Sequence, residues 1–165
     1  MLLIREFRNR DFDGVVRCHQ ACFAQRGHSR WGLARLVRFH GNTTFVAEFN
    51  GEVVGVALGI TAHGLMTGEV KCQAWLTGLS VLPKRELLFA GCYLRLLKAL
   101  GERLLVLGFH EAYATTNRKN MQYIAERVGA ELIATEPDYY FDGAERSIYR
   151  ITPRVMPHVY ELLDP

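Results

Sequence analysis

The sequence lacks the features that point directly to a bound metal or a disulfide framework. Its four cysteines, Cys18, Cys22, Cys72 and Cys92, have neither the spacing of a zinc site nor the density of a disulfide scaffold. Cys18 and Cys22 stand one turn apart on an expected helix, so we expect buried thiols in a reducing compartment. The histidines and acidic residues form no recognisable ligand cluster. We therefore expect no metal.

Long hydrophobic runs are also missing, and we expect no leader segment. No segment approaches the roughly 20 apolar residues that cross a bilayer. Charge already appears at Arg5 and Glu6, which is too early for a signal peptide. These absences predict a cytoplasmic protein with no membrane contact.

A strong excess of one charge is absent too. The formal net charge is +3, and the basic residues are scattered apart from a group at Arg30, Arg35 and Arg38 and the pair Lys84-Arg85. Proteins that bind nucleic acid usually concentrate basic residues on one face. The charge therefore argues against a nucleic-acid partner and suits a small anionic ligand or an acidic carrier protein.

What remains is an ordinary globular composition, with 49% hydrophobic and 22% charged residues. A chain of this length buries about two-thirds of its extended surface and needs no covalent staple. We expect one domain over residues 1–165, without repeats or linkers, and leave open whether it is a monomer or a homodimer.

Hydrophobic periodicity and turn signals predict alternating strands and helices. Helices are expected at residues 11–25, 29–39, 86–107 and 118–128, with a short one beyond Pro153. Strands are expected at residues 2–8, 43–49, 53–60, 70–81, 109–116, 130–134 and 147–152, with a loop at 61–68. Asn50-Gly51 is a typical hairpin turn, and Gly108 fits the position just after a helix.

With this order of elements, the chain resembles the GNAT superfamily of N-acetyltransferases over nearly its whole length. The resemblance rests on the Asn50-Gly51 hairpin, on Leu79-Ser80-Val81-Leu82-Pro83 before a long helix, and on Glu126-Arg127-Val128-Gly129-Ala130. Residues 138–143 also resemble the tyrosine-rich loop of the ribosomal-protein N-terminal acetyltransferases. The resemblance implies an α/β fold with a mixed central sheet of about seven strands and helices on both faces.

The resemblance also implies acetyl-CoA as the co-substrate and transfer of its acetyl group to a primary amine of a small molecule or peptide. In this superfamily two neighbouring strands, here 75–81 and 109–116, diverge and expose backbone groups that pair with the pantetheine arm. The next turn holds the pyrophosphate through N–H groups at a helix N-terminus. The implied donor-binding residues are Leu79, Ser80, Val81, Lys84, Arg85, Glu86, Ala90, Gly91, Cys92 and Asn117.

The phosphate-binding turn departs from the superfamily pattern of a basic or amide residue followed by glycines. Glu86 replaces the basic or amide residue, and its carboxylate would repel a phosphate. Phe89 replaces a glycine and obstructs close backbone approach, although Gly91 is kept. The departure leaves two alternatives open. One is a longer acyl donor carried by CoA or by an acyl carrier protein, and the other is a catalytically silent domain of the same fold.

The reaction needs a base for the amine and an acid for the leaving thiolate. Glu111 is the expected base, with His110, Glu69 or a water relay as alternatives, and strand alternation should send only one of His110 and Glu111 toward the pocket. Tyr123 is the expected acid, because the superfamily's usual tyrosine position holds Ala125. The expected acceptor-binding residues are Trp31, Trp75, Thr77, Tyr139 and Tyr140.

Overall fold

The computed structural model describes residues 1–24, 27–66, 69–76, 80–82, 87, 91–138 and 143–163, with only the backbone described for residues 61–66, 69–76 and 80. Its α-helices are α1 (Phe12–Phe23), α2 (Arg30–His40), α4 (Cys92–Val106), α5 (Lys119–Arg127) and α6 (Met156–Leu163). Its strands are β1 (Leu2–Glu6), β2 (Thr44–Phe49), β3 (Glu52–Met66), β4 (Glu69–Leu76), β5 (Ser80–Val81), β6 (Ala112–Thr116), β7 (Glu131–Glu136) and β8 (Arg146–Ile151).

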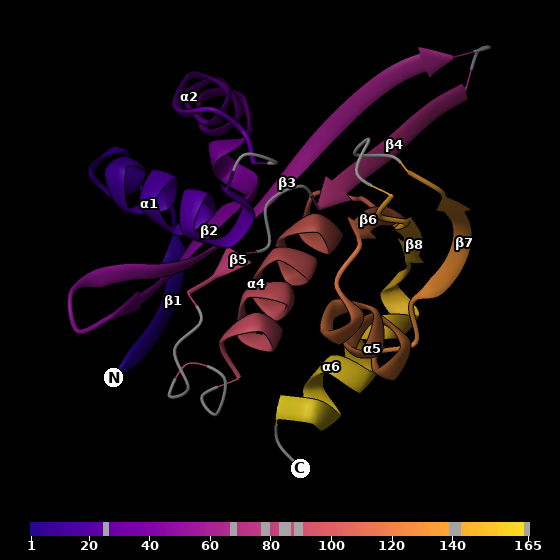
Figure 1. The fold of residues 1–165 in the computed structure, drawn as a ribbon. Helices are drawn as coiled ribbons and strands as arrows, with labels where there is room; N and C mark the ends of the chain where they lie inside the picture. The colour runs from indigo at the N-terminus through magenta and orange to yellow at the C-terminus, as the bar shows by residue number, and fades with distance from the viewer. Residues whose placement is uncertain are drawn as a thin grey trace.

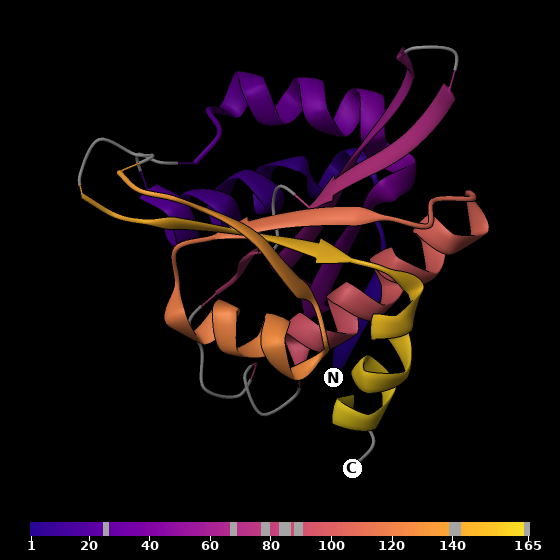
Figure 2. The same ribbon diagram turned by 90° about the vertical axis from the view of Figure 1, so that its right-hand side faces the viewer.

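The elements form three layers with the strands in the middle (Figure 1). Helices α1 and α2 cover one face of the sheet, and α4, α5 and α6 lie on the other, as the view in Figure 2 shows. The predicted α/β architecture with helices on both faces is confirmed. Within the described ranges, no helix combines the length and the apolar composition that a membrane crossing requires.

The strands are hydrogen-bonded in the order β1-β2-β3-β4-β6-β8-β7, and β5 pairs with β3 beside this path. The expected single sheet of about seven strands is nevertheless wrong in one respect. The ladders fall into two parts that share β3, because the first half of β3 pairs with β2 and β5 and its second half pairs with β4. The second part continues through β6, β8 and β7.

Two other predictions are also corrected. The segment expected to be a loop at residues 61–68 is strand up to Met66, and Gly64 pairs there with Lys71. This outer half of the β3–β4 hairpin projects from the body of the protein (Figure 1). The expected helix from residue 86 to residue 107 is not continuous. Its main part is α4, which begins at Cys92, because Gly91 adopts a left-handed conformation with φ +62° that a continuous helix cannot contain.

Helix ends follow the expected local chemistry. At the start of α2, the backbone N–H of Gly32 donates to the Ser29 hydroxyl over 3.1 Å. After α4, Gly108 has φ +83°, and the N–H of Phe109 donates to the Leu104 carbonyl over 2.9 Å, which closes the helix as predicted.

The main core lies between α4 and the inner sheet. Leu96, Leu100 and Leu104 recur on one side of α4 and are at most 5% exposed. They share a cluster with buried residues of β2 and β3, including Phe45, Ala47 and Ala57. Burial of this apolar stripe fixes α4 against the strands, at about 25 cal/mol for each Å² removed from water.

A charged network joins the first strands to the start of α1. The Arg5 guanidinium donates to both carboxylate oxygens of Asp11 over 2.7 and 2.8 Å, and to Glu48 over 2.6 Å. Asp11 is only 5% exposed and also accepts the backbone N–H of Arg8 over 2.7 Å. The Arg5 hydrogen bond lowers the pKa of Asp11 below its usual value. The network therefore stabilises the fold at neutral pH.

We expect Asp11→Asn to lower the free energy of unfolding by about 3 kcal/mol, because removal of one partner leaves the Arg5 cation only partly compensated. The loss should be full at pH 7, should start to shrink as the pH falls toward about 4, where the unfolded chain takes up the proton, and should disappear only below the lowered pKa of Asp11 in the folded protein. Urea unfolding at several pH values measures both effects.

Asp13→Asn is the matched control, because Asp13 pairs with Arg30 over 2.6 Å while its side chain is 70% exposed. An exposed pair contributes less than about 1 kcal/mol. Equal losses for the two variants would contradict a special role for the buried network.

Candidate functional site

The candidate site begins where β5 and β6 separate. The parallel ladder between β4 and β6 runs from Ala74–Ala112 to Leu76–Ala114. Beyond it, β5 continues along β3, whereas Thr115 and Thr116 stay paired with β8. Residues 80–81 and 115–116 are thus held by different neighbours. We call this region the β5–β6 divergence, and it confirms the expected separation of the two strands.

The ladder along β3 contains an irregularity at the same place. From Gly59 to Val56, β3 advances by three residues while the partner strand advances by four, from Leu76 to Ser80. An additional residue in one strand shifts the register and redirects backbone groups, which is typical of strands beside functional sites.

Val81 directs its backbone groups into the divergence. The neighbouring Leu82 N–H donates to the Val54 carbonyl of β3 over 2.8 Å, so the N–H and C=O of Val81 point away from β3. We call these two groups the Val81 edge. The Val81 carbonyl accepts a hydrogen bond from the Cys22 thiol over 3.2 Å, and the Val81 N–H donates a hydrogen bond to the Tyr93 hydroxyl. Side chains from α1 and α4 thus occupy both groups.

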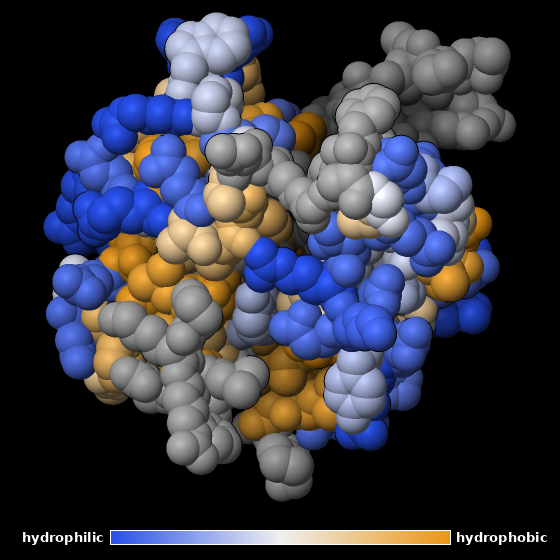
Figure 3. Space-filling view, in the orientation of Figure 1, coloured by the Kyte–Doolittle hydropathy of each residue, from blue (hydrophilic) through white to orange (hydrophobic). Residues whose placement is uncertain are grey.

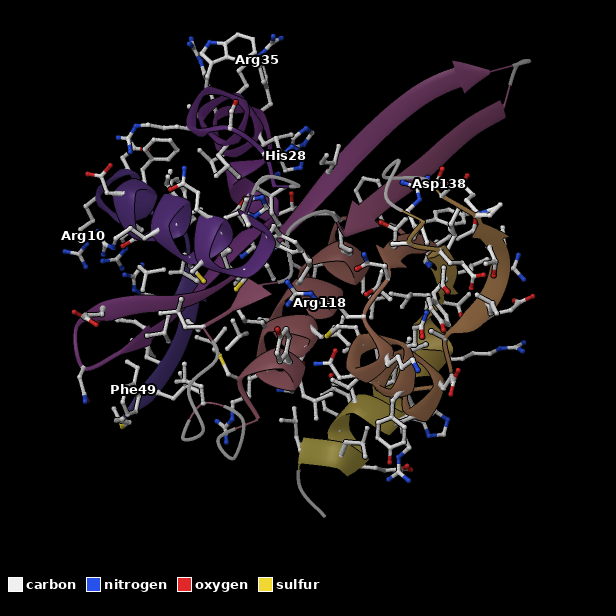
Figure 4. All side chains as sticks on the ribbon, in the orientation of Figure 1. Arg10, His28, Arg35, Phe49, Arg118 and Asp138 are labelled. Carbon is white, nitrogen blue, oxygen red and sulfur yellow. The ribbon has the colours of Figure 1, made fainter. Side chains whose placement is uncertain are left out.

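Arg118 spans the divergence in front of this edge. Its guanidinium donates to the Cys22 carbonyl in the last turn of α1 and lies 5.4 Å from the centre of the Phe23 ring. Its own N–H donates to the Thr116 hydroxyl over 3.0 Å, which fixes the start of α5. Figure 4 shows the side chain between α1 and α5, and Figure 3 shows apolar surface meeting hydrophilic surface near the centre of this face.

The environment of Cys22 favours its thiolate. A hydrogen bond from Cys18 lowers the pKa of Cys22 to about 7, and the nearby Arg118 cation acts in the same direction against the effect of burial. Burial raises the pKa of Tyr93, and proximity to Cys22 adds to this. At neutral pH, Tyr93 therefore keeps its proton, whereas Cys22 divides between the thiol, which donates to the Val81 carbonyl, and the thiolate, which does not.

The expected donor-binding residues that the structure describes lie on β5, at the start of α4 and just after β6. Ser80 and Val81 form β5, Gly91 precedes α4, and Asn117 is half-buried just after β6. Cys92 is 1% exposed, and burial raises the pKa of its thiol to about 11, so its side chain belongs to the core. Leu79, Lys84, Arg85, Glu86, Phe89 and Ala90 lie outside the described residues.

The two expected proton-transfer residues are not brought together. Glu111 precedes β6, at the end away from the divergence, and its carboxylate lies 3.6 Å from Arg150. His110 and Glu111 both line one cavity of about 40 Å³ there, so the expected alternation between them is wrong because the strand begins only at Ala112. Tyr123 lies on the outer side of α5 and is 60% exposed.

Of the expected acceptor-binding residues, only Trp31 has a described side chain. It lies on α2, is 68% exposed, and stacks with the Arg35 guanidinium 4.8 Å from its ring centre. The backbone of Trp75 pairs with that of Tyr113. Thr77, Tyr139 and Tyr140 are outside the described residues. Among the described residues, no group of three or more histidine, cysteine or acidic side chains could hold a metal.

A buried histidine positions the connection between α1 and α2. His19 is 2% exposed, and its Nε2 atom accepts the backbone N–H of His28 over 2.9 Å. The neutral ring therefore carries its proton on Nδ1, which has no hydrogen-bond partner among the described residues. Burial lowers the pKa of His19 to about 4, and the neighbouring His28 contributes.

Tyr93 and Arg118 were not identified from the sequence as site residues, and Cys22 was identified only as a buried thiol. Tyr93 had one available signal, its place two residues after Gly91 at the start of the long helix. Arg118 follows Asn117 directly, but only the folded chain brings it against the end of α1.

No protein-family model and no curated protein matches the chain. Solved structures do. The NatC complex bound to Gag peptide and CoA has a chain with a TM-score of 0.80 and 12% identity, covering 92% of this chain and 98% of that one. Arabidopsis thaliana Naa50 with the bisubstrate analogue CoA-Ac-MVNAL has a TM-score of 0.73 and 17% identity, and the match covers 92% of this chain and 98% of that one. The Escherichia coli ribosomal-protein-S18-alanine N-acetyltransferase has a TM-score of 0.69 and 21% identity, and the match covers 92% of this chain and 94% of that one.

These neighbours are GNAT acetyltransferases, and the chain has their fold. At identities of 12% to 21%, the likeness establishes the fold and leaves the chemistry to be argued from the residues of this chain.

We expect Cys22 to be the thiol whose alkylation by iodoacetamide follows ionisation near pH 7. Only the thiolate reacts, so the rate at Cys22 should rise with pH and level off above about 7. Arg118→Gln removes the neighbouring cation and should move this midpoint upward. Peptide mass spectrometry follows each cysteine separately, and Cys92 is the internal control that should stay unmodified. A Cys22 midpoint at or above about 8.5 would contradict the assignment.

We expect the free energy of unfolding to fall as the pH drops from about 6.5 to 4, because the unfolded chain protonates His19 before the folded chain does. The pKa difference corresponds to a loss on the order of 3 kcal/mol. His19→Gln keeps an acceptor for the His28 N–H but does not titrate, so its stability should fall less over this range. Parallel pH dependences for the two proteins would refute the role of His19.

Proposed function

We propose that the chain is an N-acetyltransferase that moves the acetyl group of acetyl-CoA to a primary amine of a peptide or small molecule. The observation that carries the proposal is the β5–β6 divergence, where the N–H and C=O of Val81 point away from β3. Backbone groups so oriented can pair with the amides of an extended pantetheine arm as an added strand would. Several neighbours of the same fold hold CoA or a CoA analogue.

The start of α4 suits the phosphate end of such a donor. The first turn of a helix presents N–H groups without internal partners, which favour an anion. Gly91 precedes this turn with φ +62°, and the Arg95 N–H is already bonded to the Gly91 carbonyl over 2.9 Å. The N–H groups ahead of Arg95 are the proposed phosphate donors, together with the side chains of Lys84 and Arg85, which precede α4 in the sequence and lie outside the described residues.

The proposed reaction is direct attack of the neutral amine on the thioester carbonyl carbon. The C–N bond forms, the C–S bond breaks, one amine proton is lost to a base, and the CoA thiolate takes up a proton. Backbone N–H groups beside the carbonyl oxygen would stabilise its negative charge. Glu111 and Tyr123 are the proposed base and acid, and the test below measures the contribution of each.

The acceptor is proposed to be an amine at the end of a peptide or on a small molecule. The NatC complex holds a Gag peptide and Naa50 holds the peptide part of CoA-Ac-MVNAL, which favours a peptide. Exposed Trp31 on α2 is the described side chain proposed to contact it, with Trp75, Thr77, Tyr139 and Tyr140 as further candidates.

We expect the purified protein to bind acetyl-CoA in isothermal titration and to acetylate peptide N-termini, with release of the CoA thiol. If Glu111 and Tyr123 transfer the protons, Glu111→Gln and Tyr123→Phe should each lower kcat by about 100-fold with little change in donor affinity. Glu102→Gln, toward the other end of α4 and with a side chain that is 46% exposed, serves as the control. Losses below about tenfold would assign proton transfer to other groups or to water.

Two alternatives are separated by the same titration. Tighter binding of a long-chain acyl-CoA would favour a longer acyl donor, with an acyl carrier protein as the next ligand to test. The occupied Val81 edge favours the second alternative, a domain of this fold without catalysis. Absence of binding by acetyl-CoA, long-chain acyl-CoA and desulfo-CoA would overturn CoA-dependent transfer.

A further inference from the structure

Two side chains from different helices hold the backbone edge that the proposed donor would use. The Cys22 thiol of α1 donates to the Val81 carbonyl over 3.2 Å, and the Tyr93 hydroxyl of α4 accepts the Val81 N–H. Cys22 is 9% exposed and Tyr93 is half-buried, so both side chains fill the space beside the edge.

Arg118 adds a third contact at the same place. Its guanidinium donates to the Cys22 backbone carbonyl and lies over Phe23, so the start of α5 is connected to the last turn of α1. The connection passes from the β6 side of the divergence to the side that carries β5. It therefore holds Cys22 toward Val81.

A pantetheine arm cannot pair with Val81 while these contacts persist. A backbone N–H donates effectively to one acceptor, so an amide oxygen of the arm and the Tyr93 hydroxyl compete for it. The thiol of Cys22 stands on the carbonyl side, where the arm's own N–H would have to approach. The free protein thus satisfies with its own side chains the groups that a ligand would satisfy.

We propose that Tyr93, Cys22 and Arg118 keep the donor site closed in the free protein and that the arm of the donor displaces Tyr93 and Cys22 from Val81. This inference rests on the proposed binding of an acyl-CoA at the divergence. The three residues then determine donor affinity, because the apparent dissociation constant equals the intrinsic one divided by the fraction of open protein.

The proposal predicts that loss of a closing contact tightens donor binding. Tyr93→Phe removes only the hydroxyl, and a hydrogen bond of typical strength corresponds to a decrease in Kd of about 3- to 10-fold. Isothermal titration with desulfo-CoA measures this without a reactive thiol on the ligand. The same substitution should lower the Tm of the free protein, since the Val81 N–H loses one of its two acceptors, Tyr93 and Cys22.

Matched variants separate closure from general damage. Tyr160→Phe removes a hydroxyl that donates to Glu102 over 2.7 Å at the other end of α4, and it should leave Kd unchanged. Cys22→Ala should tighten binding, whereas Cys22→Ser keeps a donor for the Val81 carbonyl and should bind like the wild type. Arg118→Gln should also tighten binding, because the connection to α1 is lost.

The outcomes distinguish this inference from the proposed function. Weaker or unchanged binding by Tyr93→Phe and Cys22→Ala, with a lowered Tm, would overturn closure and make these residues donor ligands or structural groups. Weaker donor binding by Arg118→Gln alone would overturn the role of Arg118 in closure and make it a residue that contacts the donor. If the wild type transfers acetyl groups and all variants bind the donor with unaltered affinity, only the closure is overturned. If no variant binds the donor, the Tyr93→Phe/Cys22→Ala double variant included, the proposed function itself is overturned.

Discussion

The structure depends on what happens to backbone hydrogen bonds where two neighbouring strands part. Among the described residues, the β4–β6 ladder reaches Leu76 and Ala114, and beyond it β5 pairs with β3 while Thr115 and Thr116 pair with β8. A buried N–H or C=O without a partner costs on the order of 1 to 3 kcal/mol, so the inward groups need other partners. In this chain Cys22 and Tyr93 supply them at Val81. Because these backbone groups have no partner on a neighbouring strand in the described part of the chain, the divergence is also a place where an extended ligand can bind.

The helices bring these partners into place because each is fixed independently against the strands. Helix α1 starts at the Arg5–Asp11–Glu48 network, and the Cys18 thiol donates to the Val54 carbonyl over 3.4 Å farther along. Helix α4 is held by its buried leucine stripe. Cys22 and Tyr93 therefore contact Val81 from helices that are fixed against the sheet. The exposed Arg118 connects α5 to α1 through a single long side chain.

Local signals in the sequence located most elements but failed where tertiary pairing overrides them. The Asn50-Gly51 turn and Gly108 act over a few residues, and each is found as expected. The glycine-containing segment 61–68 was expected to be a loop, but pairing with β4 makes it strand up to Met66. Leucine spacing could not reveal that Gly91 interrupts the helix, because periodicity does not report a backbone with positive φ.

The sequence by itself determined the order of strands and helices, the buried face of α4 and the resemblance to the GNAT fold, because these follow from periodicity and turn chemistry along the chain. Only the tertiary structure decided which side chains meet at the site. Cys22, Tyr93 and Arg118 are separated by about 70 and 25 residues in the sequence, and no spacing rule relates them. Glu111 and Tyr123 have suitable chemistry, yet the start of β6 and the rotation of α5 place them elsewhere. Convergence on Val81 arises from packing, which depends on the whole fold.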